Sequence, residues 1–207
     1  MALHWCDIQG PRRIEGQVAR MNNSSSTQDE TAHQRKTTLR TFRFTEELAH
    51  ALEAEAQEQG MTLNALVSLI LTKHVEWDGK AGKFGYIPVY KPVLASLLQA
   101  SDEESLVRMG RTILAPMWKE MASFWYHDTS EEKILDLLSM RSRHLPYVQT
   151  EVMKEGRRCT IVTHHDLGPK WSFVLQGAFD ELVRKSFHSQ PTISVGETVV
   201  TVDFPLP

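Results

Sequence analysis

The chain has 207 residues, of which 41% are hydrophobic and 24% are charged, and its formal net charge is −3 at pH 7. No apolar run approaches the ~18 residues that span a bilayer, and this length allows one large domain or two small ones. Its two cysteines, Cys6 and Cys159, form no CxxC pair, so the sequence indicates neither a disulfide framework nor a thiolate zinc cluster. The first residues show no signal-peptide pattern, and we expect a cytoplasmic protein.

Residues 1–36 are polar and include the stretch MNNSSSTQDETAHQ, which has almost no apolar side chains. Such a composition buries too little surface to offset the entropy of ordering the chain, so we expect a flexible basic and polar arm. Basic residues prevail over acidic ones up to residue 44, whereas acidic residues prevail from 45 to 79. The small net charge therefore conceals an uneven distribution, in which a basic segment precedes an acidic segment that is expected to be helical.

Residues 39–44, LRTFRF, alternate as a strand does. In an extended chain Phe42 and Phe44 share one face, and Thr41 and Arg43 share the other. Thr45 stands where the N-cap of a helix is expected, and two glutamates follow it, where they complement the helix dipole.

Two helices are predicted next, separated by a glycine. Apolar residues at helical spacing indicate a first helix that Gly60 ends in a left-handed conformation. Thr62 caps a second helix, LNALVSLIL, which is apolar almost all round. Because one strand and two short helices cannot bury such a helix, a partner is required, and a symmetric second copy can pair the strand and cover the helix.

Residues 37–77 resemble the ribbon-helix-helix superfamily of DNA-binding proteins, which includes the Arc and MetJ repressors. The resemblance rests on the order of strand LRTFRF, cap Thr45, first helix, turn GMT and apolar helix LNALVSLIL. It implies an intertwined homodimer whose paired strands form a β-ribbon in the major groove of double-stranded DNA.

The same resemblance implies roles for individual residues. The base-reading positions are Leu39, Thr41 and Arg43, where arginine can donate two hydrogen bonds to guanine. Leu39 is apolar, whereas the family usually has a polar residue that contacts a base at this position. Arg40 falls on the strand face that is expected to point into the dimer core. Phosphate contacts are expected from the basic residues beside the ribbon and the amides that begin the second helix: Arg35, Lys36, Arg40, Thr62, Leu63 and Asn64. The expected dimer core is Phe42, Phe44, Leu52, Leu66, Leu69 and Ile70.

Three glycines in the stretch WDGKAGKFG, residues 77–85, predict a linker or turn cluster. We therefore expect a DNA-binding domain at 37–79 and a second domain at 80–207. In the second domain the pattern predicts several helices, one of them kinked or split at Pro116, followed by a β-β-α-β-β run with a hairpin at KEGR. The fold class expected for the whole chain is α+β.

Two features of the second domain suggest chemistry. The stretch CTIVTHHD contains Cys159, His164, His165 and Asp166, whose side chains can bind a transition metal such as nickel, zinc or copper. Strand-end histidines that only make hydrogen bonds are the alternative, since an isolated pair is weak evidence for a metal. A methionine and aromatic stripe from Met117 to Trp125 indicates core packing or a dimer interface, with a small-molecule pocket as the alternative.

The sequence therefore predicts a homodimeric or larger homo-oligomeric, sequence-specific transcription regulator, a repressor, whose second domain senses a ligand or sets the oligomeric state. A metal-responsive regulator that uses the His164 and His165 region is one alternative. An antitoxin of a toxin-antitoxin pair is another, and a DNA-tethered enzyme is a third. No phosphate loop, HExxH or GxSxG motif occurs and no nucleophile is placed beside HHD, so we expect no catalytic residues, no resident cofactor and no membrane partner.

Overall fold

The computed structural model describes residues 38–207. The predicted arm, Cys6, and the phosphate-contacting Arg35 and Lys36 lie outside the described residues. Residues 44–207 form one compact unit, and residues 38–43 lie outside it. The structure combines helices with a four-stranded antiparallel sheet, so the α+β class is confirmed.

The compact unit begins with helices α1 (Glu46–Glu58) and α2 (Leu63–Lys73), followed without interruption by a π-helical turn, η1 (His74–Asp78), and α3 (Gly79–Phe84). The prediction of a linker at residues 77–85 is therefore wrong. Trp77 and Ala81 are buried in the main core, and this burial outweighs the low helix propensity of the glycines. Only Gly85, with a φ of 99°, ends the helix in a left-handed conformation.

Four further helical segments precede the sheet. They are α4 (Lys91–Gln99), α5 (Glu103–Met109), α6 (Ala115–Tyr126) and α7 (Glu131–His144), with a second π-helical turn, η2 (Gly110–Leu114), between α5 and α6. Pro116 lies at the start of α6, directly after the π-helical turn η2, and helical conformation continues from α5 through η2 into α6. The helix is therefore not split at this proline.

The sheet consists of two hairpins joined by a long helix. Strands β1 (Val148–Glu155) and β2 (Arg158–His165) form the first hairpin, α8 (Pro169–Ser186) follows, and β3 (Thr192–Val195) and β4 (Val199–Pro205) form the second. The strand order is β1-β2-β4-β3, so β2 and β4 are the central strands. The β-β-α-β-β prediction is confirmed.

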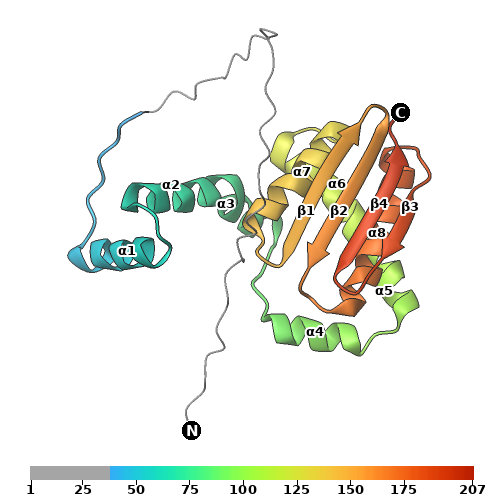
Figure 1. Cartoon of the computed structure of the whole chain (residues 1–207), viewed down its shortest axis with the longest axis horizontal. Coiled ribbons are helices and arrows are strands. Elements are labelled where there is room, and N and C mark those ends of the chain that lie inside the picture. The colour runs from blue at the N-terminus through green and yellow to red at the C-terminus, as the bar shows by residue number, and fades with distance from the viewer. Residues whose placement is uncertain (1–37) are drawn as a thin grey trace, which may run out of the picture. The chain divides into compact units, whose positions relative to one another are not determined.

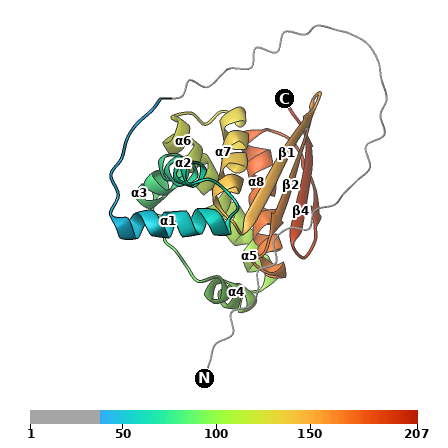
Figure 2. The ribbon, with the colours of Figure 1, turned by 60° about the vertical axis from the view of Figure 1, so that its left-hand side comes forward.

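Figure 1 and Figure 2 show α6, α7 and α8 on one face of this sheet. Side chains of β2 alternate accordingly: Cys159, Ile161, Thr163 and His165 are buried beneath the helices, whereas Thr160, Val162 and His164 lie on the opposite face. Among the described residues no helix covers that opposite face.

The core lies between the helices and the sheet and contains Trp118, Met121, Leu137 and Phe179. Trp118, Met121 and Trp125 of the predicted stripe are buried there, which confirms core packing for these three, whereas Phe124 is exposed. In residues 38–207 no helix has both the length and the apolar character needed to cross a membrane.

Candidate nucleic-acid interface

The turn between α1 and α2 is fixed by hydrogen bonds that its sequence dictates. The Thr45 hydroxyl accepts a hydrogen bond from the Leu48 amide at 3.3 Å, and the Thr62 hydroxyl accepts one from the Ala65 amide at 3.2 Å. Both predicted caps are thus confirmed. Gly60 adopts a φ of 64°, as predicted, and the amides of Gly60 and Met61 close a Schellman motif at the end of α1.

The first turn of α2 presents backbone donors without competing negative charge. It contains no acidic residue, and Thr62 and Asn64 are exposed while Leu63 is half-buried. The unpaired amides of such a turn, together with the helix dipole, attract an anion. This is the arrangement that the phosphate-contact prediction requires of Thr62, Leu63 and Asn64.

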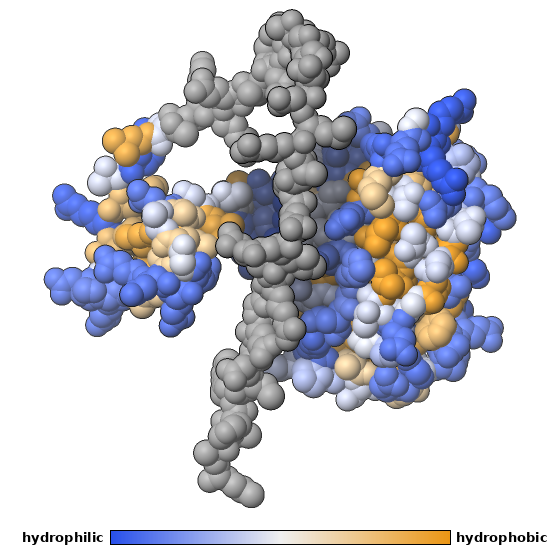
Figure 3. Space-filling view, viewed as in Figure 1, coloured by the Kyte–Doolittle hydropathy of each residue, from blue (hydrophilic) through white to orange (hydrophobic). Residues whose placement is uncertain are grey.

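Apolar side chains of α1 and α2 are only partly covered. Leu66 is buried within its own chain at 1% exposure, and Leu52 is half-buried. In contrast, the exposed fractions of Leu69, Ile70 and Val75 are 55%, 42% and 70%. Figure 3 shows apolar atoms gathered over α1 and α2. The assignment of Leu66 to a dimer core is therefore incomplete, because this side chain already packs in the single chain.

Residues 38–45 form neither helix nor strand in the single chain. Leu39, Thr41 and Arg43 are exposed, as is Arg40, and the two phenylalanines Phe42 and Phe44 are 61% and 45% exposed. A strand exists only when a neighbour pairs its N–H and C=O groups. The predicted ribbon requires that pairing from a second chain, and it stays a prediction.

The four candidate metal ligands of the second domain are not brought together. Cys159 and His165 lie on the buried face of β2 and are six residues apart, which is about 20 Å along a strand. His164 and Asp166 are exposed, and the Asp166 carboxylate is paired with Lys91 at 2.6 Å. Within residues 38–207 no three acidic, histidine or cysteine side chains are grouped to hold a metal ion. The metal prediction fails because alternate strand residues point in opposite directions.

His165 instead has a structural partner. Its Nε2 lies 2.8 Å from the Ser172 hydroxyl, which also donates to the Glu197 carbonyl at 3.3 Å. Burial lowers the pKa of His165, so the neutral ring is favoured. The alternative of a hydrogen-bonded strand-end histidine is thus the one that the geometry supports for this residue.

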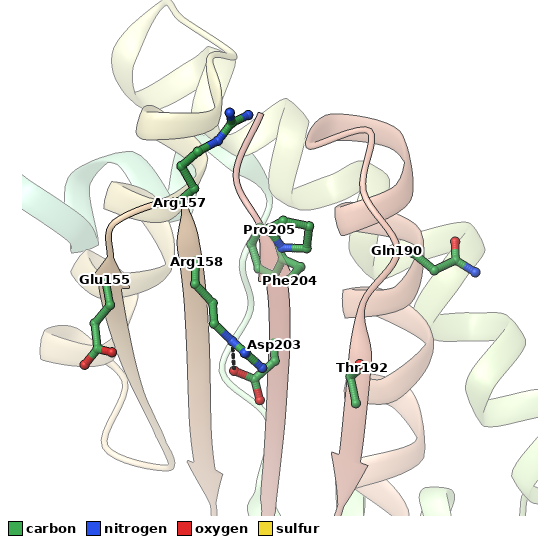
Figure 4. A pocket seen from close by; sticks show the side chains of 8 residues that line it. All are labelled: Glu155, Arg157, Arg158, Gln190, Thr192, Asp203, Phe204 and Pro205. Atoms are coloured by element: carbon green, nitrogen blue, oxygen red, sulfur yellow. Dashed lines mark ion pairs between the residues drawn. The ribbon is translucent and has the colours of Figure 1, made fainter.

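A shallow pocket lies at the end of the sheet where β2, β3 and β4 meet, and Figure 4 shows the side chains that line it. Two of its charged side chains are paired with each other: Asp203 accepts a hydrogen bond from Thr160 at 2.6 Å and lies 3.5 Å from the Arg158 Nε. Arg157 extends away from this pair in Figure 4. The ion pair of Arg158 and Asp203 therefore joins β2 to β4 at this end of the sheet.

The sequence analysis did not predict a cluster of contacts between the continuous helical segment α2–η1–α3 and the helices α6 and α7. Trp77 packs against Trp125, Tyr86 and His144, with ring centroids 5.5, 5.3 and 6.3 Å away. The Trp125 indole donates to the Glu76 carbonyl at 3.0 Å, and the Glu76 carboxylate lies 3.1 Å from the His144 Nε2. The glycines that follow Trp77 obscured its place in a helix.

Comparison with known proteins adds no relative: the chain matches no family model and no curated protein sequence.

Proposed function

We propose that the protein is a homodimeric, sequence-specific DNA-binding regulator, a repressor of the ribbon-helix-helix kind. In this proposal residues 39–44 of two chains pair as a ribbon that enters the major groove, and the first turn of α2 contacts phosphates. The α+β domain that follows senses a ligand or sets the oligomeric state.

One observation carries the proposal: two capped helices joined through a left-handed Gly60 leave apolar side chains exposed before and along α2. Phe42, Phe44, Leu69, Ile70 and Leu71 are each at least 42% exposed. Apolar atoms that gather on an exposed surface, as those over α1 and α2 do in Figure 3, mark an interaction site. An intertwined second copy supplies both missing elements, a strand for residues 39–44 and a cover for α2.

The alternatives fit less well. An antitoxin of this architecture has a short unfolded tail, whereas residues 91–207 carry a sheet packed against several helices. A metal-responsive regulator needs ligands that converge, and the His164 and His165 side chains point to opposite faces of β2. A DNA-tethered enzyme has no specific observation in its favour, since the Asp203 carboxylate of the pocket at the end of the sheet is already paired with Arg158.

The test is fluorescence anisotropy with DNA from upstream of the protein's own gene, against a scrambled duplex, across a salt series. The double variant Thr41→Ala/Arg43→Ala should bind the upstream DNA at least about 30-fold more weakly, because two base contacts of about 1–3 kcal/mol each are lost. Its binding to the scrambled duplex should change little, since phosphate contacts supply most non-specific affinity.

The matched control is Arg157→Ala, which removes an exposed arginine in the β1–β2 turn, far along the chain from the ribbon. Light scattering should give about twice the chain mass of 23.6 kDa for all variants. If the double variant binds both duplexes as the wild type does while remaining a folded dimer, the ribbon is not the reader and the proposal fails.

A further inference from the structure

Helix α4 carries two stripes of apolar side chains, and only one of them packs against its own domain. Leu98 is the one buried residue of α4, and Leu94 beside it is half-buried. In contrast, the N-cap residue Tyr90 and the helical residues Val93 and Leu97 are 84%, 52% and 62% exposed. Their spacing of three and four residues places these three side chains along one line of the helix surface. In Figure 1 and Figure 2 α4 lies at the margin of the domain.

Charged side chains hold both ends of α4 and leave the exposed stripe free. At the N-terminal end the Lys91 ammonium lies 2.6 Å from the Asp166 carboxylate. At the C-terminal end the Lys170 ammonium donates to the Gln99 carbonyl at 3.1 Å and also to the Ser101 carbonyl. The helix therefore has a fixed orientation although it buries little apolar surface, and the stripe is a preformed surface.

The stripe has the spacing by which two helices pack along a seam. Tyr90, Val93, Leu97 and the exposed Ala100 follow one another at intervals of three, four and three residues, as the a and d positions of paired helices do. In an antiparallel pair of identical helices, Val93 faces Leu97 of the second copy and Tyr90 faces Ala100 of the second copy. A large side chain thus meets a small one and the seam closes, whereas parallel helices would bring the two Tyr90 rings together.

The charges along α4 also favour a second copy of the chain as the partner. No charged residue occurs between Lys91 and Asp102, so a two-fold axis through the stripe brings no like charges together. The antiparallel arrangement places the positive end of one helix, with Lys91, beside the negative end of the other, which the exposed acidic residues 102–104 follow. A neutral centre with opposite charges at its flanks is self-complementary.

We propose that two copies of this chain associate through α4, with the helices antiparallel and Tyr90, Val93, Leu97 and Ala100 in the seam. Four side chains from each copy make a small contact, so the association is weak, with a Kd of about 0.1 mM. The ribbon of the proposed function joins chains through residues 39–44 and α2, which are separate from this surface. The α4 contact therefore joins one ribbon dimer to another. The resulting tetramer rests on the proposed function, whereas the contact between α4 helices does not.

The first test is sedimentation velocity of the full chain, from about 5 µM to about 0.5 mM. The average mass of the wild type should rise from about twice to more than three times the chain mass of 23.6 kDa. Leu97→Glu places a carboxylate in the apolar seam and should raise the Kd of this step at least about tenfold. The matched control Gln99→Glu adds the same charge at an exposed position on the other side of the helix and should associate as the wild type does. Both variants should keep the wild-type Tm, because both side chains are exposed.

The second test is the orientation of the two helices, measured with a short thiol cross-linker in a Cys6→Ser background. A mixture of Val93→Cys and Leu97→Cys chains should give mainly the mixed cross-linked product, because antiparallel helices bring positions 93 and 97 together. Parallel helices would instead link each variant to itself, and this result would overturn the proposed seam.

The proposal is also overturned if the wild type keeps twice the chain mass at the highest concentration, or if Leu97→Glu and Gln99→Glu associate equally. Association that appears only after removal of residues 1–37 would make this segment the cover of the stripe, and the assignment to a second copy would be wrong. A wild type that passes from monomer to dimer, with this step lost in Leu97→Glu, supports the α4 contact and refutes the ribbon dimer. The DNA titration tests the proposed function separately, since its outcome at low concentration does not depend on α4.

Discussion

Two glycines allow α5 and η2 to approach α8 closely, and their positions yield a sharp prediction. A Cβ added at Gly110 would lie 2.0 Å from the Val174 carbonyl oxygen and 2.7 Å from the Ala178 nitrogen. A Cβ added at Gly177 would lie 2.0 Å from the Val107 carbonyl oxygen. These glycines therefore let α5 and η2 meet α8 backbone to backbone, with no side chain between them.

The substitution Gly110→Ala forces the two helices apart, because the obstacle is the backbone of α8 and not a movable side chain. Overpacking costs about 1–3 kcal/mol in cores that can adjust, and here we expect about 3 kcal/mol or more. For a chain of this size that corresponds to a fall in Tm of about 6–12 °C. The control is Gly82→Ala in α3, where an added Cβ meets nothing within 4 Å.

Chemical unfolding with guanidinium chloride, followed by circular dichroism at a fixed protein concentration, measures both variants. Gly82→Ala should be as stable as the wild type or up to about 1 kcal/mol more stable, because alanine favours the helix. Gly110→Ala should unfold at markedly lower denaturant. Equal midpoints for Gly110→Ala and Gly82→Ala would refute the close crossing of η2 and α8.

Two further predictions concern pH and the α1–α2 turn. Burial lowers the pKa of His165 below its usual value of 6.5, so the unfolded state binds more protons than the folded state as pH falls below 6.5. The free energy of unfolding should therefore fall as the pH is lowered from 7.5 to 5.5. His165→Asn should reduce this dependence on pH, whereas the control His164→Asn should keep it. If both variants keep the full dependence, His165 is not its cause. Gly60→Ala meets no atom within 4 Å, but its φ of 64° should cost about 1–2 kcal/mol of stability in denaturant titrations. No loss in this variant would show that the turn adopts another conformation.

Local signals were sufficient for most of the elements. Hydroxyl caps at Thr45 and Thr62 and a left-handed Gly60 defined the two helices, since each effect involves atoms within four residues. Alternation along CTIVTHH places Cys159, Ile161, Thr163 and His165 on one face of a strand, and these four side chains are the buried ones of β2. The hairpin and the position of α8 also followed from period and turn residues.

Predictions from short sequence patterns failed where burial in the tertiary structure outweighed the local conformational preference. The glycines after Trp77 predicted a linker, but Trp77 and Ala81 pack into the core and the helix continues through them. The same limit applied to the candidate metal site, because a cluster of ligand types in sequence does not say that their side chains converge. The burial of Arg141 on α7 gave no signal at all, since an arginine near the end of a helix is ordinarily solvated.

The sequence by itself determined the helical unit with its caps, the alternating strands and the α+β class, because these depend on propensity and periodicity over short distances. Only the tertiary structure decided that α2 continues into the core through Trp77, that Gly110 and Gly177 lie against facing helix backbone, and that Arg141 is buried beside Trp118. Those features depend on contacts between residues far apart in the chain, and their free energy is set by packing and desolvation.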